Sequence, residues 1–131
     1  MLKLEHIDVT DRGELHLPGA CGAVSSVLSR VGDKWTVLIV ITLAKRPHRF
    51  NELKRAIGGV SQRMLTLALR GLERDGLVSR KMFYTIPPRV DYALTDLGHS
   101  LCVPVNALAG WAFENIPCIE AARVTFDARP E

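Results

Sequence analysis

Four polar side chains between residues 61 and 75 recur at the three- and four-residue spacing that brings them to one side of a helix. Arginine, glutamine and threonine are side chains that hydrogen-bond to base edges in a DNA major groove. An ordinary surface helix is the alternative interpretation, so the neighbouring segments must decide between the two. The polar set is Gln62, Arg63, Thr66 and Arg70, with Glu73 beside it, and the apolar residues expected on the opposite side are Met64, Leu65, Ala68, Leu69 and Leu72.

Three cysteines, Cys21, Cys102 and Cys118, are the other reactive groups, and their odd number and wide spacing argue against a disulfide framework or a zinc site. Cys21 stands at the start of a predicted helix, where the helix dipole and free amides favour the thiolate. It is either a reactive thiol or a small buried residue. An enzyme with Cys21 as nucleophile and His16 or His48 as base is a further hypothesis. No glycine-rich phosphate loop or paired-carboxylate motif supports it, so we expect no catalytic residues, no metal and no cofactor.

Positive charge is concentrated in one third of the chain. Residues 45–91 hold 11 basic and 4 acidic residues, whereas the remainder holds 6 basic and 10 acidic residues. A polyanion such as double-stranded DNA is the natural partner of that third, although solvated surface lysines and arginines would give the same count.

The chain has 131 residues, of which 47% are hydrophobic, and this suits one compact domain. The longest apolar run, residues 35–44, is about half of what a membrane-spanning helix needs. The first residues do not show the pattern of a secretory signal. We therefore expect a cytoplasmic protein with no membrane partner.

The periodicity predicts four helices before residue 76. They cover 21–31, 34–44, 50–57 and 62 to about 75, and the second is apolar nearly all round, as a central helix should be. Gly58-Gly59-Val60 separates the third from the fourth, and Ser61 is placed to cap the fourth. Two short helices joined by a three-residue turn with glycine are typical of a helix-turn-helix.

Two strands are predicted next, over 77–84 and 89–94, joined by a turn that contains Pro87 and Pro88. Near the tip of this hairpin, Lys81, Tyr84 and Arg89 can reach backbone phosphates, as Ser61 can at the start of the fourth helix. The N-terminal arm, residues 1–20, shows only a short predicted strand at 14–17. The fold class expected is therefore mainly α with a small β-hairpin: a winged helix-turn-helix domain with a C-terminal dimerisation helix.

The last predicted helix runs from Leu97 to about Asn115, with Pro104 bending or interrupting it. It exceeds what one small core needs, so we expect it to form a dimer surface with the first helix; packing on its own domain is the alternative. The expected divisions are an arm at 1–20, a DNA-binding domain at 21–96, a dimerisation helix at 97–117 and a tail at 118–131. The interface residues expected are Val24, Leu28, Leu101, Leu108 and Trp111.

Five blocks of sequence closely resemble the HxlR-type regulators of the MarR-like winged-helix group, within a match that runs from about Cys21 to Trp111. The resemblance implies a homodimer that binds a pseudo-palindromic operator, with the fourth helix in the major groove and the hairpin as the wing, and that controls transcription. The blocks are residues 27–36, 49–53, 60–66, 69–78 and 87–98.

Some members of this family sense oxidants or electrophiles through a cysteine before the first helix, usually followed by proline. Cys21 matches that place, but Gly22 stands where the proline is usual, so the sensing role stays open. A small-molecule effector is also open. Cys102 is either a resolving partner across the interface or a packing residue. A winged helix used only for protein contacts remains a third hypothesis. The face of the fourth helix is rich in arginine and glutamine, which argues against this hypothesis.

Overall fold

The computed structural model describes residues 8–9, 15–16 and 21–130, and the chain divides into two compact units, Met1–Asp33 and Lys34–Glu131. In the first unit, β1 (Asp8–Val9) pairs antiparallel with β2 (Leu15–His16), and α1 covers Cys21–Val31. The helix predicted over 21–31 is confirmed. The strand predicted at 14–17 is found at its two central residues, and Glu14, Leu17 and most of the predicted arm lie outside the described residues.

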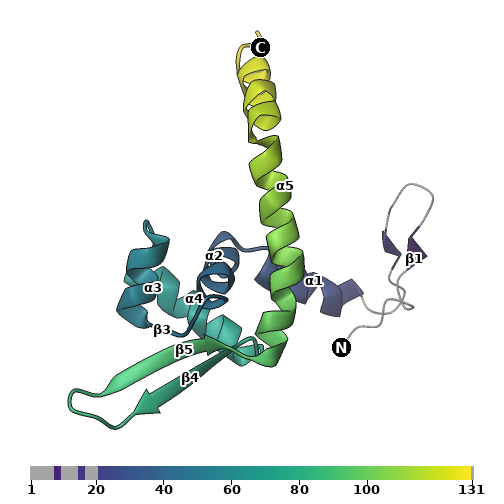
Figure 1. The fold of residues 1–131 in the computed structure, drawn as a ribbon. Helices are drawn as coiled ribbons and strands as arrows, with labels where there is room; N and C mark the ends of the chain where they lie inside the picture. The colour runs from purple at the N-terminus through teal and green to yellow at the C-terminus, as the bar shows by residue number, and fades with distance from the viewer. Residues whose placement is uncertain (1–7, 10–14, 17–20, 131) are drawn as a thin grey trace. The chain divides into compact units, whose positions relative to one another are not determined.

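The core of the second unit is built around α2 (Lys34–Leu43), which contacts α3, α4, α5 and β5 (Figure 1). Because α2 is apolar on nearly every side, it can be covered from all these directions at once. Thr36, Ile39, Val40 and Leu43 are buried along it. Burying a side chain such as Ile39 contributes about 1.5–3 kcal/mol, so α2 is a main contributor to the stability of the unit.

The helix-turn-helix consists of α3 (Phe50–Ile57) and α4 (Gln62–Arg74), as the periodicity predicted. Gly58 and Gly59 have φ values of 68° and 70°, a left-handed conformation that side chains with a Cβ disfavour. The Ser61 hydroxyl oxygen accepts a 3.1 Å hydrogen bond from the Met64 amide and so caps α4. The turn between the two helices is therefore set by local residues.

A three-stranded antiparallel sheet in the order β3-β5-β4 lies beside these helices, and the β4–β5 hairpin projects from the unit (Figure 1). β4 covers Val78–Phe83 and β5 covers Arg89–Leu94, within a residue of the predicted bounds. β3 (His48–Arg49) was not predicted, since residues 45–48 were expected to be a turn. It pairs His48 with Tyr92 and Arg49 with Asp91, and two residues are too few to show an alternating pattern in the sequence.

The last helix, α5, covers Asp96–Asp127, so the prediction that it ends near Asn115 and leaves residues 118–131 as a tail is wrong. Pro104 and Pro117 lie inside α5, and neither ends it. A proline removes one backbone hydrogen bond, whereas the helix-forming residues that follow Pro117, among them Glu120, Ala121 and Ala122, favour continuation.

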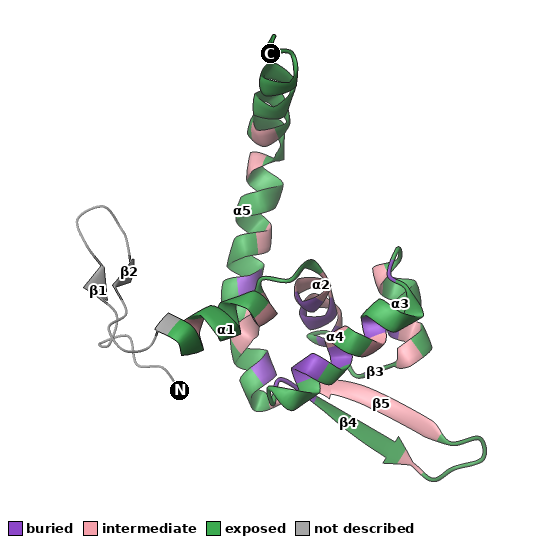
Figure 2. Cartoon of the chain, turned by 180° about the vertical axis from the view of Figure 1, so that it is seen from behind, coloured by how far each residue is buried: buried purple, intermediate pink, exposed green. Residues whose placement is uncertain are grey.

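Thr95 caps α5 through a 3.1 Å hydrogen bond from the Gly98 amide, and only Gly98 and Val105 are buried along the helix. The second half of α5 runs clear of the other elements of its unit and is mostly exposed (Figures 1 and 2). No helix in the described part of the chain is both long enough and apolar enough to cross a membrane.

Candidate nucleic-acid interface

The two faces predicted for α4 are largely present. Leu65, Leu69 and Leu72 are buried in the core, whereas Gln62, Arg63 and Arg70 are exposed, and Thr66 is half-buried. We call the set Gln62, Arg63, Thr66 and Arg70 the polar face of α4. The assignment of Met64 to the inner side is wrong, because 44% of it is exposed. Its place in the first turn, ahead of the buried residues, leaves it beyond the edge of the core.

Two hydroxyl groups near the start of α4 already have partners within the helix. The Ser61 oxygen accepts from the Met64 amide, so its own proton remains available to a phosphate oxygen. The Thr66 hydroxyl donates to the Gln62 carbonyl at 2.8 Å, which leaves its methyl group for apolar contact, for example with the methyl of thymine. The first turn of α4 therefore offers a phosphate donor next to side chains suited to bases.

The wing, which we define as the β4–β5 hairpin, presents Lys81 and Tyr84 to solvent, and Tyr84 is 92% exposed. Arg89 is more constrained. Its guanidinium carbon lies 4.3 Å from the centroid of the Phe83 ring, and its Nε lies 3.3 Å from a carboxylate oxygen of Asp91. Stacking on Phe83 and the nearby Asp91 charge restrain Arg89, whose Nε makes no hydrogen bond to a described residue, so less side-chain entropy is lost when it binds an anion. The roles of Phe83 and Asp91 could not be predicted from the sequence, since both depend on the strand register.

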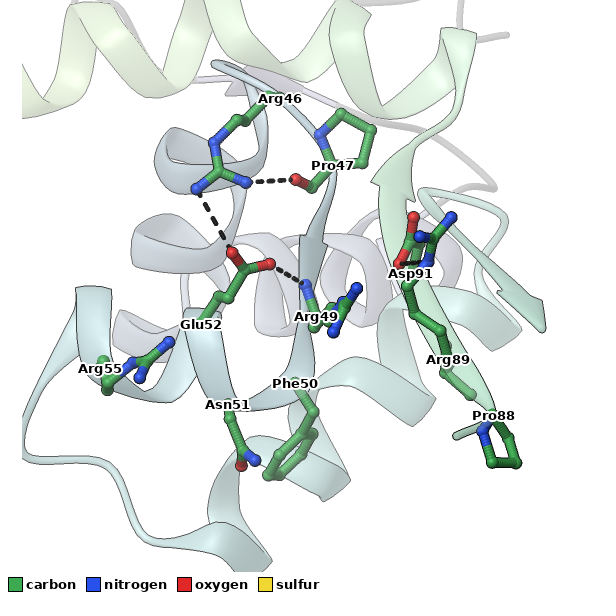
Figure 3. Close-up of a pocket in the computed structure, with 11 residues that line it drawn as sticks. Arg46, Pro47, Arg49, Phe50, Asn51, Glu52, Arg55, Pro88, Arg89 and Asp91 are labelled. Carbon is green, nitrogen blue, oxygen red and sulfur yellow. Dashed lines mark hydrogen bonds and ion pairs between the residues drawn. The ribbon is translucent and has the colours of Figure 1, made fainter. Parts of the chain in front are cut away.

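A groove of about 730 Å³ separates the start of α3 from the start of β5 (Figure 3). Four guanidinium groups from four different segments line it, and two carboxylates offset part of their charge. We call it the arginine groove; its charged residues are Arg46, Arg49, Arg55, Arg89, Glu52 and Asp91.

Glu52 organises one wall of the arginine groove. Its carboxylate accepts a 2.8 Å hydrogen bond from the Arg49 amide and lies 3.6 Å from the Arg46 guanidinium (Figure 3). The hydrogen bond from the Arg49 amide lowers the pKa of Glu52, and the Arg46 charge lowers it further. Of the four groove arginines, only Arg89 was predicted from the sequence to bind DNA. Arg46, Arg49 and Arg55 were counted only as part of the basic third, because the fold alone brings residues 46–55 beside β5.

Of the three candidate enzyme residues, only His48 has a described side chain, and its setting suits a structural role. His48 is buried, and its Nδ1 lies 2.7 Å from the Arg46 carbonyl oxygen, so it ties the start of β3 to the preceding turn. The side chains of His16 and Cys21 lie outside the described residues. Cys102 is half-buried, with its sulfur 3.8 Å from the Gly98 carbonyl oxygen, and Cys118 is exposed.

Some of the residues predicted for a dimer interface are exposed to solvent. On α5, Leu108 and Trp111 are more than half exposed, and Leu101 is half-buried. On α1 of the first unit, Leu28 is exposed and Val24 is half-buried. Within α5, Leu108 and Trp111 are three residues apart and so place two large apolar side chains in solvent on one side of the helix.

Comparisons with known proteins agree with this architecture. The family model described as HxlR-like helix-turn-helix matches residues 30–120. The chain is 44% identical over 97 residues to YtfH of Escherichia coli K12, an HTH-type transcriptional regulator, and the match covers 74% of this chain and 77% of YtfH.

Two solved structures show the same fold. A structure of a transcriptional regulator ytfH from Salmonella typhimurium is 42% identical, with a TM-score of 0.71, and the match covers 76% of this chain and 89% of that one. The redox regulator HypR in its oxidized form is 38% identical, with a TM-score of 0.67. The match covers 71% of this chain and 96% of the HypR chain. Together with the family match, these similarities show that the chain belongs to the HxlR-like helix-turn-helix family of transcriptional regulators.

Proposed function

We propose that two copies of this chain bind a pseudo-palindromic operator, with the polar face of α4 from each copy in successive major grooves of double-stranded DNA. The observation that carries this proposal is the exposure of Gln62, Arg63 and Arg70 on a helix whose opposite side is the core of the unit. Two half-sites about 34–36 Å apart would match the two-fold symmetry of such a dimer.

Within this proposal, the polar face specifies sequence and the wing positions the protein. Arg63 and Arg70 are suited to guanine and Gln62 to adenine, whereas Thr66 contributes its methyl group. Ser61 donates to a phosphate at the start of α4, and Lys81, Tyr84 and Arg89 contact the backbone from the wing. The polar face of α4 therefore reads the bases, whereas Ser61 and the wing contact the DNA backbone.

The proposed dimer surface is the exposed apolar side of α5, together with α1. Leu108 is 57% and Trp111 is 58% exposed, and residues three apart lie on the same side of a helix. Large aromatic side chains such as Trp111 are common anchors of protein interfaces. A second copy is the partner we propose, since two HTH units are needed to read two half-sites. The division into a DNA-binding domain at 21–96 and a dimerisation helix stays a proposal, with the end of that helix at 127.

Oxidants or electrophiles are the proposed signal, and Cys21 is the proposed sensor. Cys21 begins α1, where a thiolate is favoured, and the structural relative HypR is described as a redox regulator. An effector that is not reactive is the alternative. A bacterial regulator of this kind would act in the cytoplasm, where its operator lies. The enzyme hypothesis is set aside, because the relatives are transcriptional regulators.

A DNA-binding titration on the region upstream of the gene, repeated at several salt concentrations, tests the proposal. We expect binding that weakens steeply with salt and a marked preference for one site over unrelated DNA. Treatment with a thiol oxidant should change binding in the native chain and leave the Cys21→Ser variant unaffected. Binding that ignores salt would overturn the regulator mechanism, whereas a response that survives in Cys21→Ser would remove only the sensor assignment. Recovery of a protein partner with no DNA binding would favour a protein-contact module.

A further inference from the structure

The arginine groove holds more positive charge than its carboxylates neutralise. Arg46 lies 3.6 Å from Glu52 and Arg89 lies 3.3 Å from Asp91, so two of the four guanidiniums have a carboxylate within ion-pair distance. Among the described residues, no ion pair involves the side chain of Arg49 or Arg55. The groove therefore carries two guanidinium groups that form no ion pair with a described residue, of which Arg49 also interacts electrostatically with Glu52.

The two paired arginines, Arg46 and Arg89, are also positioned by neighbouring side chains before any ligand binds. Glu52 is anchored by the Arg49 amide, and it orients Arg46 on one wall. Phe83 and Asp91 hold Arg89 on the other wall. Figure 3 shows the four arginines reaching the groove from separate segments: the α2–β3 turn, β3, α3 and β5. A tetrahedral anion with several acceptor oxygens can satisfy guanidiniums that converge from different directions.

The groove continues the proposed DNA surface, because Arg89 belongs to both the groove and the wing. We infer that the arginine groove seats a phosphate of the DNA backbone beside the wing, with Arg49 and Arg55 as the residues that bind it. This inference rests on the proposed function. It extends the contact surface from α4 and the wing to α3, and it adds neither base contacts nor sequence preference.

The experiment compares Arg49→Gln and Arg55→Gln with Lys54→Gln. Lys54 is exposed on α3 next to Arg55 but does not line the groove, so its variant removes the same charge from the same helix. Each phosphate contact adds about 0.9 to the slope of log affinity against log salt. The proposed dimer carries two copies of Arg55, so Arg55→Gln should lower the slope by about 1.8. Between about 50 and about 200 mM salt, native binding should therefore weaken about 12-fold more than binding by Arg55→Gln, on operator and unrelated DNA alike. The Lys54→Gln variant should keep the native slope, and equal thermal midpoints will show that all variants fold.

Three results would overturn the inference. Equal slopes for Arg55→Gln and Lys54→Gln, with normal binding by the native chain, would show that the groove lies off the DNA, and the proposed function would stand. Stabilisation of the DNA-free native chain by inorganic pyrophosphate, absent in Arg55→Gln and accompanied by unchanged DNA slopes, would assign the groove to a free anion. Absence of salt-dependent DNA binding by the native chain would overturn the proposed function and the groove assignment together.

Discussion

Helices α4 and α5 belong to the same unit, yet they expose opposite kinds of surface. In α4 the leucines at 65, 69 and 72 are buried, and the outward side carries arginine and glutamine. In α5 only Gly98 and Val105 are buried, and Trp111 and Phe113 are among the side chains left in solvent. Figure 2 shows the difference as a buried stripe along α4 and a mostly exposed α5.

The contrast indicates which helix needs a partner to complete its apolar packing. Leu65, Leu69 and Leu72 of α4 are buried within one chain, and the exposed side of the helix carries the polar face together with Leu67. Most of the apolar surface of α5 remains uncovered, and burying it contributes about 25 cal/mol per Å². A second copy of the chain supplies that burial in the proposed dimer, and the following changes test the two helices separately.

The largest effect is expected on the free energy of unfolding of Leu69→Ala, and Leu108→Ala is the variant with which it is compared. Leu69 is buried, so its truncation leaves a cavity and should lower the free energy of unfolding by about 2–5 kcal/mol. Leu108 is exposed in the single chain, so its truncation should act mainly through the dimer. Urea denaturation at two protein concentrations separates them: the loss in Leu69→Ala should not depend on concentration, whereas that in Leu108→Ala should. Similar, concentration-independent losses would argue against the α5 interface.

Trp111→Asp should break the proposed dimer. An interfacial tryptophan of this type contributes about 2 kcal/mol or more, so the dimer dissociation constant should rise about 30-fold or more. Sedimentation velocity measures this directly, and DNA binding should weaken in parallel. Glu114→Gln, an exposed polar change on the same helix, is the matched control. A dimer that persists in Trp111→Asp would place the interface elsewhere.

Arg63→Ala should weaken operator binding by about 1–3 kcal/mol and relax the preference at one position of each half-site. The reason is the loss of a bidentate contact to a base edge. Competition with operators that differ by single base pairs gives the measurement. If the preference at every position survives the substitution, Arg63 does not read bases.

The smallest effect is expected from Lys81→Ala on the wing. A phosphate contact carries no sequence information, so affinity should fall by about 1 kcal/mol or less per copy for operator and unrelated DNA alike. The salt slope should fall by about 1 per copy, or about 2 for the proposed dimer. DNA-binding titrations with operator and with unrelated DNA, repeated at several salt concentrations, give the measurement. A sequence-dependent loss would move Lys81 from backbone contact to base readout.

Local sequence predicted most of the elements because their signals lie within a few residues. The leucine spacing in α4, the Ser61 cap and the positive-φ glycines at 58 and 59 each act over one or two turns of chain. Prediction failed where the outcome depended on distant segments or on competing local signals. β3 exists only because β5 pairs with it, and α5 continues past Pro117 although proline disfavours a helix interior.

The candidate site divides in the same way. The polar face of α4 could be predicted from its periodicity, since a helix turns each side chain by a constant angle whatever surrounds it. The stacking of Arg89 on Phe83 and the meeting of residues 46–55 with β5 could not, because strand register and chain reversal set those distances. Short-range order follows from backbone geometry along the chain, whereas the grouping of four arginines around one groove required the folded packing of strands and helices.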